Sequence, residues 1–145
     1  MTSLRKTLAI TTAAPSALWI AHAPASAQSK FAREPGETYS MNVMVSAHPN
    51  WVPVFEGFKQ AASAMGCEVI FSGTPDYDIT KQVASFEQDL VKAPKGILLH
   101  PMQADPFIEP INRAVDSGVP IVTFAADSPD SKRVSYITSD NLAEA

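Results

Sequence analysis

The sequence predicts an α/β fold, an open parallel sheet with helices on both faces. Strand-like and helix-like segments alternate with little connecting length, and five strands with three intervening helices imply βαβ units with right-handed crossovers. The run Ile-Leu-Leu at 97–99 is apolar throughout, as is typical of a strand covered on both faces. The expected strands are 39–47, 68–71, 96–99, 119–124 and 135–138.

The first strand and helix are marked by a change in the apolar pattern. Residues 39–47 place apolar side chains at alternate positions from Met41 onward, which predicts a strand. Residues 51–65 follow as a helical segment, and Gly66 can take the left-handed conformation that ends many helices. Asn50 precedes this helix and is a candidate cap for it.

The second unit begins with a short strand at 68–71, rich in β-branched and aromatic residues, and continues into a turn at 72–77. We assign Asp78 to capping the helix that follows, and expect Pro94 and Gly96 to end it. The apolar residues expected on one face of this helix are Ile79, Val83, Phe86 and Leu90.

A third helix is expected from Asp105 until Gly118 stops it. Pro110 conflicts with this start because proline removes a backbone hydrogen bond one turn into the helix. A late start or a kink would resolve the conflict. The apolar residues expected on one face are Phe107, Ile108, Ile111, Ala114 and Val115.

Charge and composition exclude several classes of partner. With 46% hydrophobic and 18% charged residues, the chain fits a globular domain. Its net charge is −4 at pH 7, and after the N-terminal segment only Lys132 and Arg133 form an adjacent basic pair. Such a domain is a poor binder of nucleic acid or anionic membranes.

The cysteine and histidine content argues against a metal or other cofactor. Cys67 is the only cysteine, which excludes an intrachain disulfide and a cysteine-based zinc site. We interpret it as a small packing residue rather than a nucleophile. His22, His48 and His100 lack the spacing of metal ligands.

Residues 1–27 have the three regions of a secretory signal peptide in the right order. Arg5 and Lys6 form the positive region, and 7–21 is uncharged and apolar or small. This stretch is too short for a membrane span, and Pro15 interrupts it.

The leader ends in Ala25-Ser26-Ala27, the small-x-small pattern that a signal peptidase accepts, so cleavage is expected before Gln28. The cleavage region has no cysteine for lipid attachment, which favours a freely diffusing protein in the periplasm. Residues 28–37 are polar and form a short lead-in segment.

Candidate binding residues follow the first, third and fourth strands, because ligands of open parallel sheets bind beyond the carboxyl ends of the strands. Asn50, Gln103 and Asp127 could pair with hydroxyl groups, while Trp51 could stack on the face of a sugar ring. Each has a structural alternative: Trp51 could cover the core, and Asn50 could cap a helix. Asp127 could shape a turn, and Asp105 is either a cap or a ligand contact.

The motifs of several enzyme classes are missing from the sequence. There is no glycine-rich phosphate loop after the first strand and no G-x-S-x-G nucleophile elbow. A receiver domain would need an aspartate directly after the third strand, where this chain has His100-Pro101. We therefore expect a binding protein rather than an enzyme.

From Met41 to Asn141 the chain resembles the type 1 periplasmic sugar-binding proteins of ABC importers, the family that includes ribose-binding protein. The matching segments are 78–82 with 86–88, 96–101, 110–114, 118–124, 128–131 and 136–141. Proline at the place of Pro110 is common in this family.

The resemblance implies a sugar or related polar solute held between two lobes, and docking on an ABC permease in the inner membrane. By position, Asn50 and Trp51 match a loop that places a polar group and an aromatic on the ligand. Gln103 stands where many relatives have an acidic contact. Ala125 stands where many have a first aspartate, and Asp127 matches the second, so the usual set of acceptors is reduced.

Members of this family are about twice as long, so we expect 38–145 to be an incomplete N-terminal lobe. We also expect the protein to be a monomer. Two other functions stay open. LacI-type regulators share this core, but carry a DNA-binding headpiece where this chain has a leader. An unrelated periplasmic α/β enzyme would be revealed by turnover of aryl glycosides.

The leader gives the first testable prediction. Expression in a Gram-negative host should yield periplasmic protein that begins at Gln28, because Ala25 and Ala27 supply the small residues that the peptidase requires. N-terminal sequencing of the periplasmic fraction measures this. A species that starts at Met1, or protein confined to the cytoplasm, would contradict it.

Overall fold

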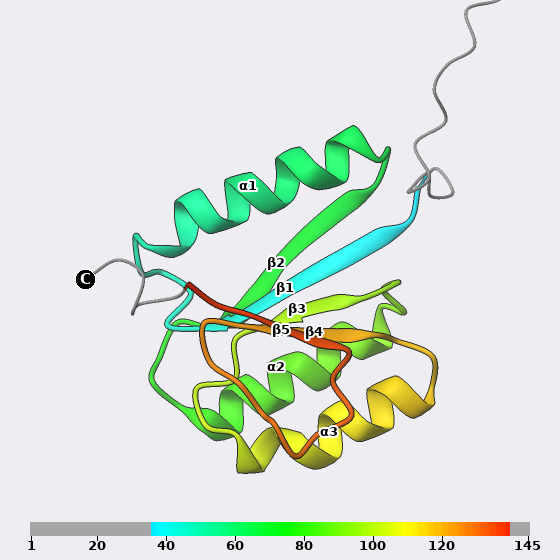
Figure 1. Ribbon diagram of the computed structural model, residues 1–145. Helices are drawn as coiled ribbons and strands as arrows, with labels where there is room; N and C mark the ends of the chain where they lie inside the picture. The colour runs from blue at the N-terminus through cyan, green and yellow to red at the C-terminus, as the bar shows by residue number, and fades with distance from the viewer. Residues whose placement is uncertain (1–35, 140–145) are drawn as a thin grey trace, which may run out of the picture.

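The computed structural model describes residues 36–139, in which strands and helices alternate as expected (Figure 1). All strand pairs are parallel, and the sheet order is β2-β1-β3-β4-β5. The leader at 1–27 lies outside the described residues, as does most of the lead-in. The elements are β1 Thr38–Met44, α1 Trp51–Ala64, β2 Glu68–Thr74, α2 Ile79–Val91, β3 Ile97–Leu99, α3 Asp105–Asp116, β4 Ile121–Phe124 and β5 Ser135–Ile137.

The prediction of a turn at 72–77 is wrong for residues 72–74, because β2 continues to Thr74. Gly73 pairs with Val43 inside the sheet, at a φ of 127°. A Cβ there would lie 1.8 Å from the Val43 carbonyl oxygen, so this glycine allows two strands to approach rather than turning the chain.

Strand β1 is shorter than the expected 39–47. It ends at Met44 because Val45 takes a left-handed conformation, with a φ of 52°, and leaves the ladder.

The helix starts test three further expectations. Asp78 caps α2 as assigned: its Oδ1 accepts a hydrogen bond from the Lys81 backbone N at 3.0 Å. Helix α3 begins at Asp105, so the late start proposed for Pro110 is wrong, and this proline lies buried inside the helix. Asp105 is the first helical residue and Ala104 is the cap, so the capping alternative for Asp105 is also wrong.

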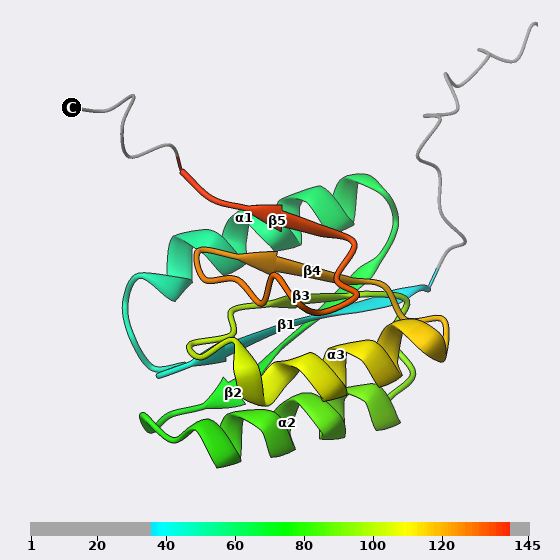
Figure 2. The same ribbon diagram turned by 60° about the horizontal axis from the view of Figure 1, so that its bottom comes forward.

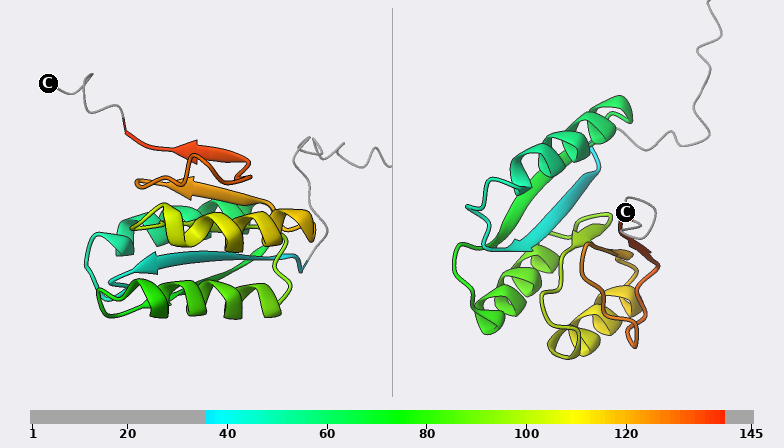
Figure 3. Two further views of the ribbon diagram at one scale, coloured as in Figure 1. Left: turned by 90° about the horizontal axis from the view of Figure 1, so that it is seen from below. Right: turned by 60° about the vertical axis from the view of Figure 1, so that its left-hand side comes forward.

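The sheet lies between two helical layers (Figures 2 and 3). Helix α1 covers one face, and α2 and α3 lie side by side on the other. The core under α2 and α3 consists of Phe86, Ile97, Leu99, Phe107, Ile111, Ala114 and Ile121. The core under α1 consists of Met41, Val43 and Phe124, with Trp51, Phe55, Phe58, Phe71 and Leu98 packed against it.

Cover on the α1 side is uneven. Helix α1 contacts β2, and an apolar groove of about 320 Å³ opens beside it over the remaining strands. Tyr39, Phe58, Leu98, Val122 and Ile137 are among the residues that line this groove. Within residues 36–139, no helix lies over β4 and β5 on this side (Figure 3).

A buried polar cluster holds α2 against β1 and β2. The Asn42 side-chain Nδ2 lies 3.0 Å from Asp89 Oδ2 and 3.2 Å from the hydroxyls of Ser72 and Ser85. Ser72 Oγ also donates to Asp89, and Lys92 Nζ lies 3.2 Å from Asp89 Oδ1. Asp89 is 1% exposed, so these hydrogen bonds and the ion pair offset the cost of burying its carboxylate.

Candidate ligand pocket

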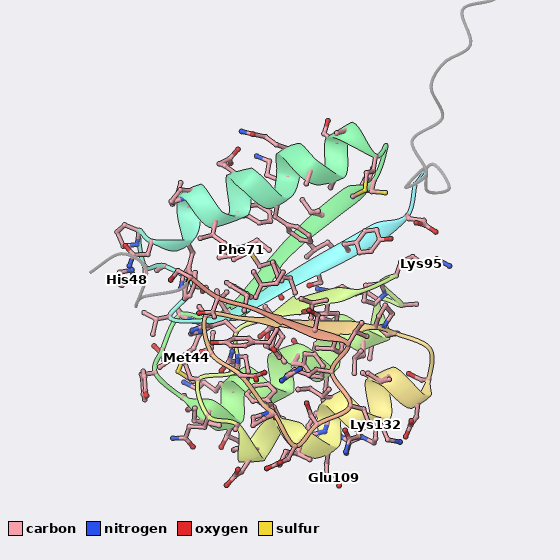
Figure 4. All side chains as sticks on the ribbon, viewed as in Figure 1. Met44, His48, Phe71, Lys95, Glu109 and Lys132 are labelled. Atoms are coloured by element: carbon pink, nitrogen blue, oxygen red, sulfur yellow. The ribbon has the colours of Figure 1, made fainter. Side chains whose placement is uncertain are left out.

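The loops that leave β1, β3 and β4 meet at the carboxyl ends of the strands. Figure 4 shows Met44 and His48 at this end of the molecule, with Lys95 at the opposite end. The loops enclose an open pocket of about 390 Å³. Its lining residues are Met44, Val45, His48, Asn50, Trp51, Val54, His100, Met102 and Ala125. The expected position of the site, beyond the carboxyl ends of a parallel sheet, therefore coincides with a pocket.

Two residues of the lining hold the left-handed backbone conformation without being glycine. Val45 has a φ of 52° and Ala125 a φ of 59°, and each directly follows a strand. For a β-branched residue such as valine this conformation is sterically costly. Strain of this kind gathers at functional sites, so it marks the rim formed by these two loops as a candidate site.

Trp51 is part of the core and of the pocket wall at once. Its indole Nε1 donates to the backbone oxygens of Met44 and Val45, at 3.1 Å each. Its ring packs at 4.8 Å from His100 and 5.8 Å from Phe124, between ring centroids. Because Nε1 is engaged with the backbone, Trp51 can offer a ligand its apolar ring surface.

Asn50 lies beside Trp51 on the exposed side of the pocket. It occupies the cap position of α1, but its side chain makes no capping hydrogen bond. Its backbone N donates to His48 Nδ1 at 3.2 Å. Asn50 therefore stands at the expected cap position without forming a cap hydrogen bond through its side chain, and it lines the pocket.

His100 is a pocket residue that sequence reasoning did not single out as a ligand contact. Its side chain is 7% exposed, and its Nδ1 is buried without a hydrogen-bond partner. Burial lowers its pKa below the ordinary value of 6.5, which favours the neutral imidazole. The signal available in the sequence was its place directly after the buried strand β3.

Asp127 is not among the pocket-lining residues, and its carboxylate is already engaged. It accepts hydrogen bonds from Thr123 Oγ1 at 2.7 Å, the Ser128 backbone N at 2.8 Å and Arg133 Nη2 at 2.8 Å. Arg133 Nε also bonds to it, completing a two-pronged ion pair. Desolvation raises the pKa of Asp127, but the hydrogen bonds from Arg133, Thr123 and Ser128 outweigh it and hold the pKa below the ordinary 3.8.

The remaining predicted contact, Gln103, is exposed and lies next to the lining residue Met102 without lining the pocket itself. Asp105 is exposed at the first turn of α3. The structure thus brings Asn50 and Trp51 together and leaves Gln103 and Asp127 outside the lining.

The remaining expectations concern the cysteine, metal ligands and membrane-spanning helices. Cys67 is buried as a free thiol that donates to the Met65 carbonyl oxygen at 3.6 Å, as expected for a packing residue. Residues 36–139 contain no group of three metal-ligating side chains. In the same range, no helix has the length and apolar content needed to cross a membrane.

The fold and the pocket define a class of protein: open parallel α/β domains with a pocket at the carboxyl ends of the strands. The periplasmic binding protein domain family matches residues 40–145. The chain therefore belongs to the periplasmic binding protein family.

Individual relatives are binding proteins for sugars. The chain is 26% identical over 113 residues to the D-allose-binding periplasmic protein of Escherichia coli K12, covering 72% of this chain and 36% of that protein. A sugar-binding protein of a sugar ABC transporter from Bacillus halodurans is 35% identical with a TM-score of 0.71, covering 74% and 37%. An arabinose-binding protein from Geobacillus stearothermophilus is 30% identical with a TM-score of 0.72, covering 75% and 38%. The chain thus spans little more than a third of the length of these relatives.

The Asp127–Arg133 ion pair gives a pH-dependent prediction. The pKa of Asp127 is lower in the folded than in the unfolded chain, so its contribution to stability is present above pH 3.8 and is lost as pH falls through the folded pKa. Arg133→Gln should lower the free energy of unfolding at pH 7 by about 1 kcal/mol. Thermal unfolding at pH 7, 5 and 3 should show this difference shrinking at the lowest pH.

Lys132→Gln is the matched control, because its exposed ion pair with Asp116 involves the neighbouring residue. Its effect at pH 7 should be smaller. Equal losses for the two variants, or a loss in Arg133→Gln that persists at pH 3, would show that the Asp127 pair does not have this role.

Proposed function

We propose that this chain binds a sugar or a related small polar solute at the carboxyl ends of its strands, as the substrate-binding component of an ABC importer. The observation that carries the proposal is the pocket in which Asn50 and Trp51 meet, in a chain of the periplasmic binding protein family. The names of its relatives, which bind D-allose or arabinose or serve a sugar transporter, support a sugar as the ligand class.

The chemistry of the pocket suits a neutral polyol. The Trp51 ring offers apolar area for the C–H face of a sugar, and the Asn50 amide offers both a donor and an acceptor for hydroxyl groups. No carboxylate is among the nine lining residues described above. Asn50 and Trp51 are the contacts that we carry forward. Gln103 and Asp127 stay predicted contacts. The Asp127 Oδ1 already accepts three hydrogen bonds, so Oδ2, which Arg133 Nη2 also contacts, is the oxygen that could accept one from a ligand.

The cellular setting belongs to the same proposal. A leader at 1–27 would direct the chain to the periplasm, and an ABC permease in the inner membrane would be its partner. We propose a monomer that binds its ligand without catalysis.

Sugar binding can be measured through Trp51. The chain has two tryptophans, so Trp19→Phe makes Trp51 the only one. Titration of this variant with D-allose, L-arabinose, D-ribose and D-glucose should give a saturable fluorescence change with at least one sugar. The pocket is open and the described residues enclose it from one side, so we expect dissociation constants in the millimolar range, on the order of −4 kcal/mol.

Glycine betaine, a small polar solute without hydroxyl groups, is the control ligand and should give no saturable change. A lack of response to every sugar, or equal responses to the sugars and to betaine, would contradict the proposed function.

A further inference from the structure

We propose that His100 is a specificity-determining residue of this pocket, which donates a hydrogen bond from Nε2 to one oxygen of a bound sugar. The inference rests on the proposed function, because it assigns a contact within the same pocket. Its starting point is a buried imidazole whose hydrogen-bonding groups the fold leaves unused.

The backbone of His100 is held from two sides. Its N donates to the Asn42 carbonyl oxygen at 2.9 Å, and its carbonyl oxygen accepts from Gln82 Nε2 at 2.7 Å. The ring is fixed between aromatic neighbours, 4.8 Å from Trp51 and 5.7 Å from Phe124. The ring therefore has little freedom to turn, and a ligand contact made by it would be preorganised.

A phenylalanine side chain would fill the position of His100 at a lower free-energy cost of burial. The imidazole has to be desolvated, and its Nδ1 is buried without a partner, whereas phenylalanine would keep the ring packing and bury no polar atom. A buried polar atom without a partner in a native fold calls for an explanation in function or in a bound water. A binding role explains the choice of histidine at a position that lines a pocket.

The geometry assigns the roles of the two ring nitrogens. A neutral imidazole carries one donor and one acceptor. An orphaned buried N–H is rarer than an orphaned acceptor, so the proton belongs on Nε2 and the lone pair on Nδ1. With Nδ1 buried, Nε2 is the nitrogen left to contact a ligand, and it does so as a donor.

The rest of the lining strengthens the assignment. The described wall has no carboxylate, lysine or arginine, and its only other titratable side chain is the exposed His48, whose Nδ1 already accepts from the Asn50 backbone. Trp51 Nε1 is engaged with the backbone. His100 Nε2 and the Asn50 amide are therefore the polar side-chain groups best placed to read the oxygens of a sugar.

The test is a double-mutant cycle between protein and ligand, in the Trp19→Phe background. The sugar that binds best and its monodeoxy analogues are titrated into the parent and into His100→Phe, which keeps a ring against Trp51 and Phe124. For one oxygen, its removal should weaken binding to the parent roughly 3- to 10-fold and leave binding to His100→Phe unchanged, as expected for one hydrogen bond. Every other deoxy analogue should affect both proteins equally.

A second measurement needs no substitution and so does not depend on the folding of a variant. Nitrogen-15 NMR of the imidazole should show the Nε2–H tautomer of His100 in the free protein, and saturation with sugar should shift Nε2 more than Nδ1.

The outcomes separate the two proposals. Sugar binding with strictly additive effects at every oxygen, or with no shift at Nε2, overturns the role of His100 and leaves the proposed function intact. A shift confined to Nδ1 indicates a water-linked structural group and overturns it as well. Failure of the parent to bind any sugar overturns the proposed function and this inference together.

Discussion

Asn42, at the centre of β1, links the packing of this domain to its pocket. Its side-chain amide bonds to Asp89 and Ser85 of α2 and to Ser72 of β2, while its backbone oxygen accepts the hydrogen bond from His100. One fully buried residue thus fixes both a helix and the point at which β3 opens into the ligand loop. Removing the amide would leave the buried carboxylate of Asp89 with Ser72 and Lys92 alone, and losing one hydrogen-bond partner of a buried group costs roughly 1–3 kcal/mol.

Helix α2 transmits this constraint along the sheet. Asp89 holds the carboxyl-terminal half of α2 to β1 and β2. Gln82, near the amino-terminal end of the same helix, donates a hydrogen bond to the His100 carbonyl oxygen. The same helix that closes one side of the core therefore sets the position of the residue on which ligand specificity is proposed to depend. Because the backbone of His100 is held on both sides, a ligand contact made by this residue would cost little ordering of the chain there.

The order and type of the elements could be predicted from the sequence because local patterns carry them. Alternating apolar runs, the Asp78 cap and the glycines that follow helices are read within a few residues. The misassigned turn at Gly73 had the opposite origin. Gly73 is required by its close approach to Val43, thirty residues earlier in the chain. A contact between distant residues of this kind cannot be predicted from the neighbouring sequence. Pro110 was tolerated inside α3 against its local preference, as a buried residue of the core side.

The position of the candidate pocket could be predicted from the sequence, but the residues that line it could be predicted only in part. Parallel strands fixed the rim on which the pocket lies, and Asn50 and Trp51 were found by their place after β1. The partners of Asp127 could not be predicted, because the sequence does not show that Arg133 pairs with its carboxylate in the fold. His100 was passed over because an unpartnered nitrogen is a property of the folded environment alone.

The central claim is that ligand binds at the carboxyl-end pocket rather than in the apolar groove beside α1. Amide chemical shifts of the isotope-labelled chain, recorded during titration with the best-binding sugar, test this most directly. Shifts should concentrate at 45–51, 100–104 and 125–127, with Lys95 at the far end of the sheet unchanged. Shifts centred on Phe58, Leu98 and Val122, which line the groove, would contradict the account.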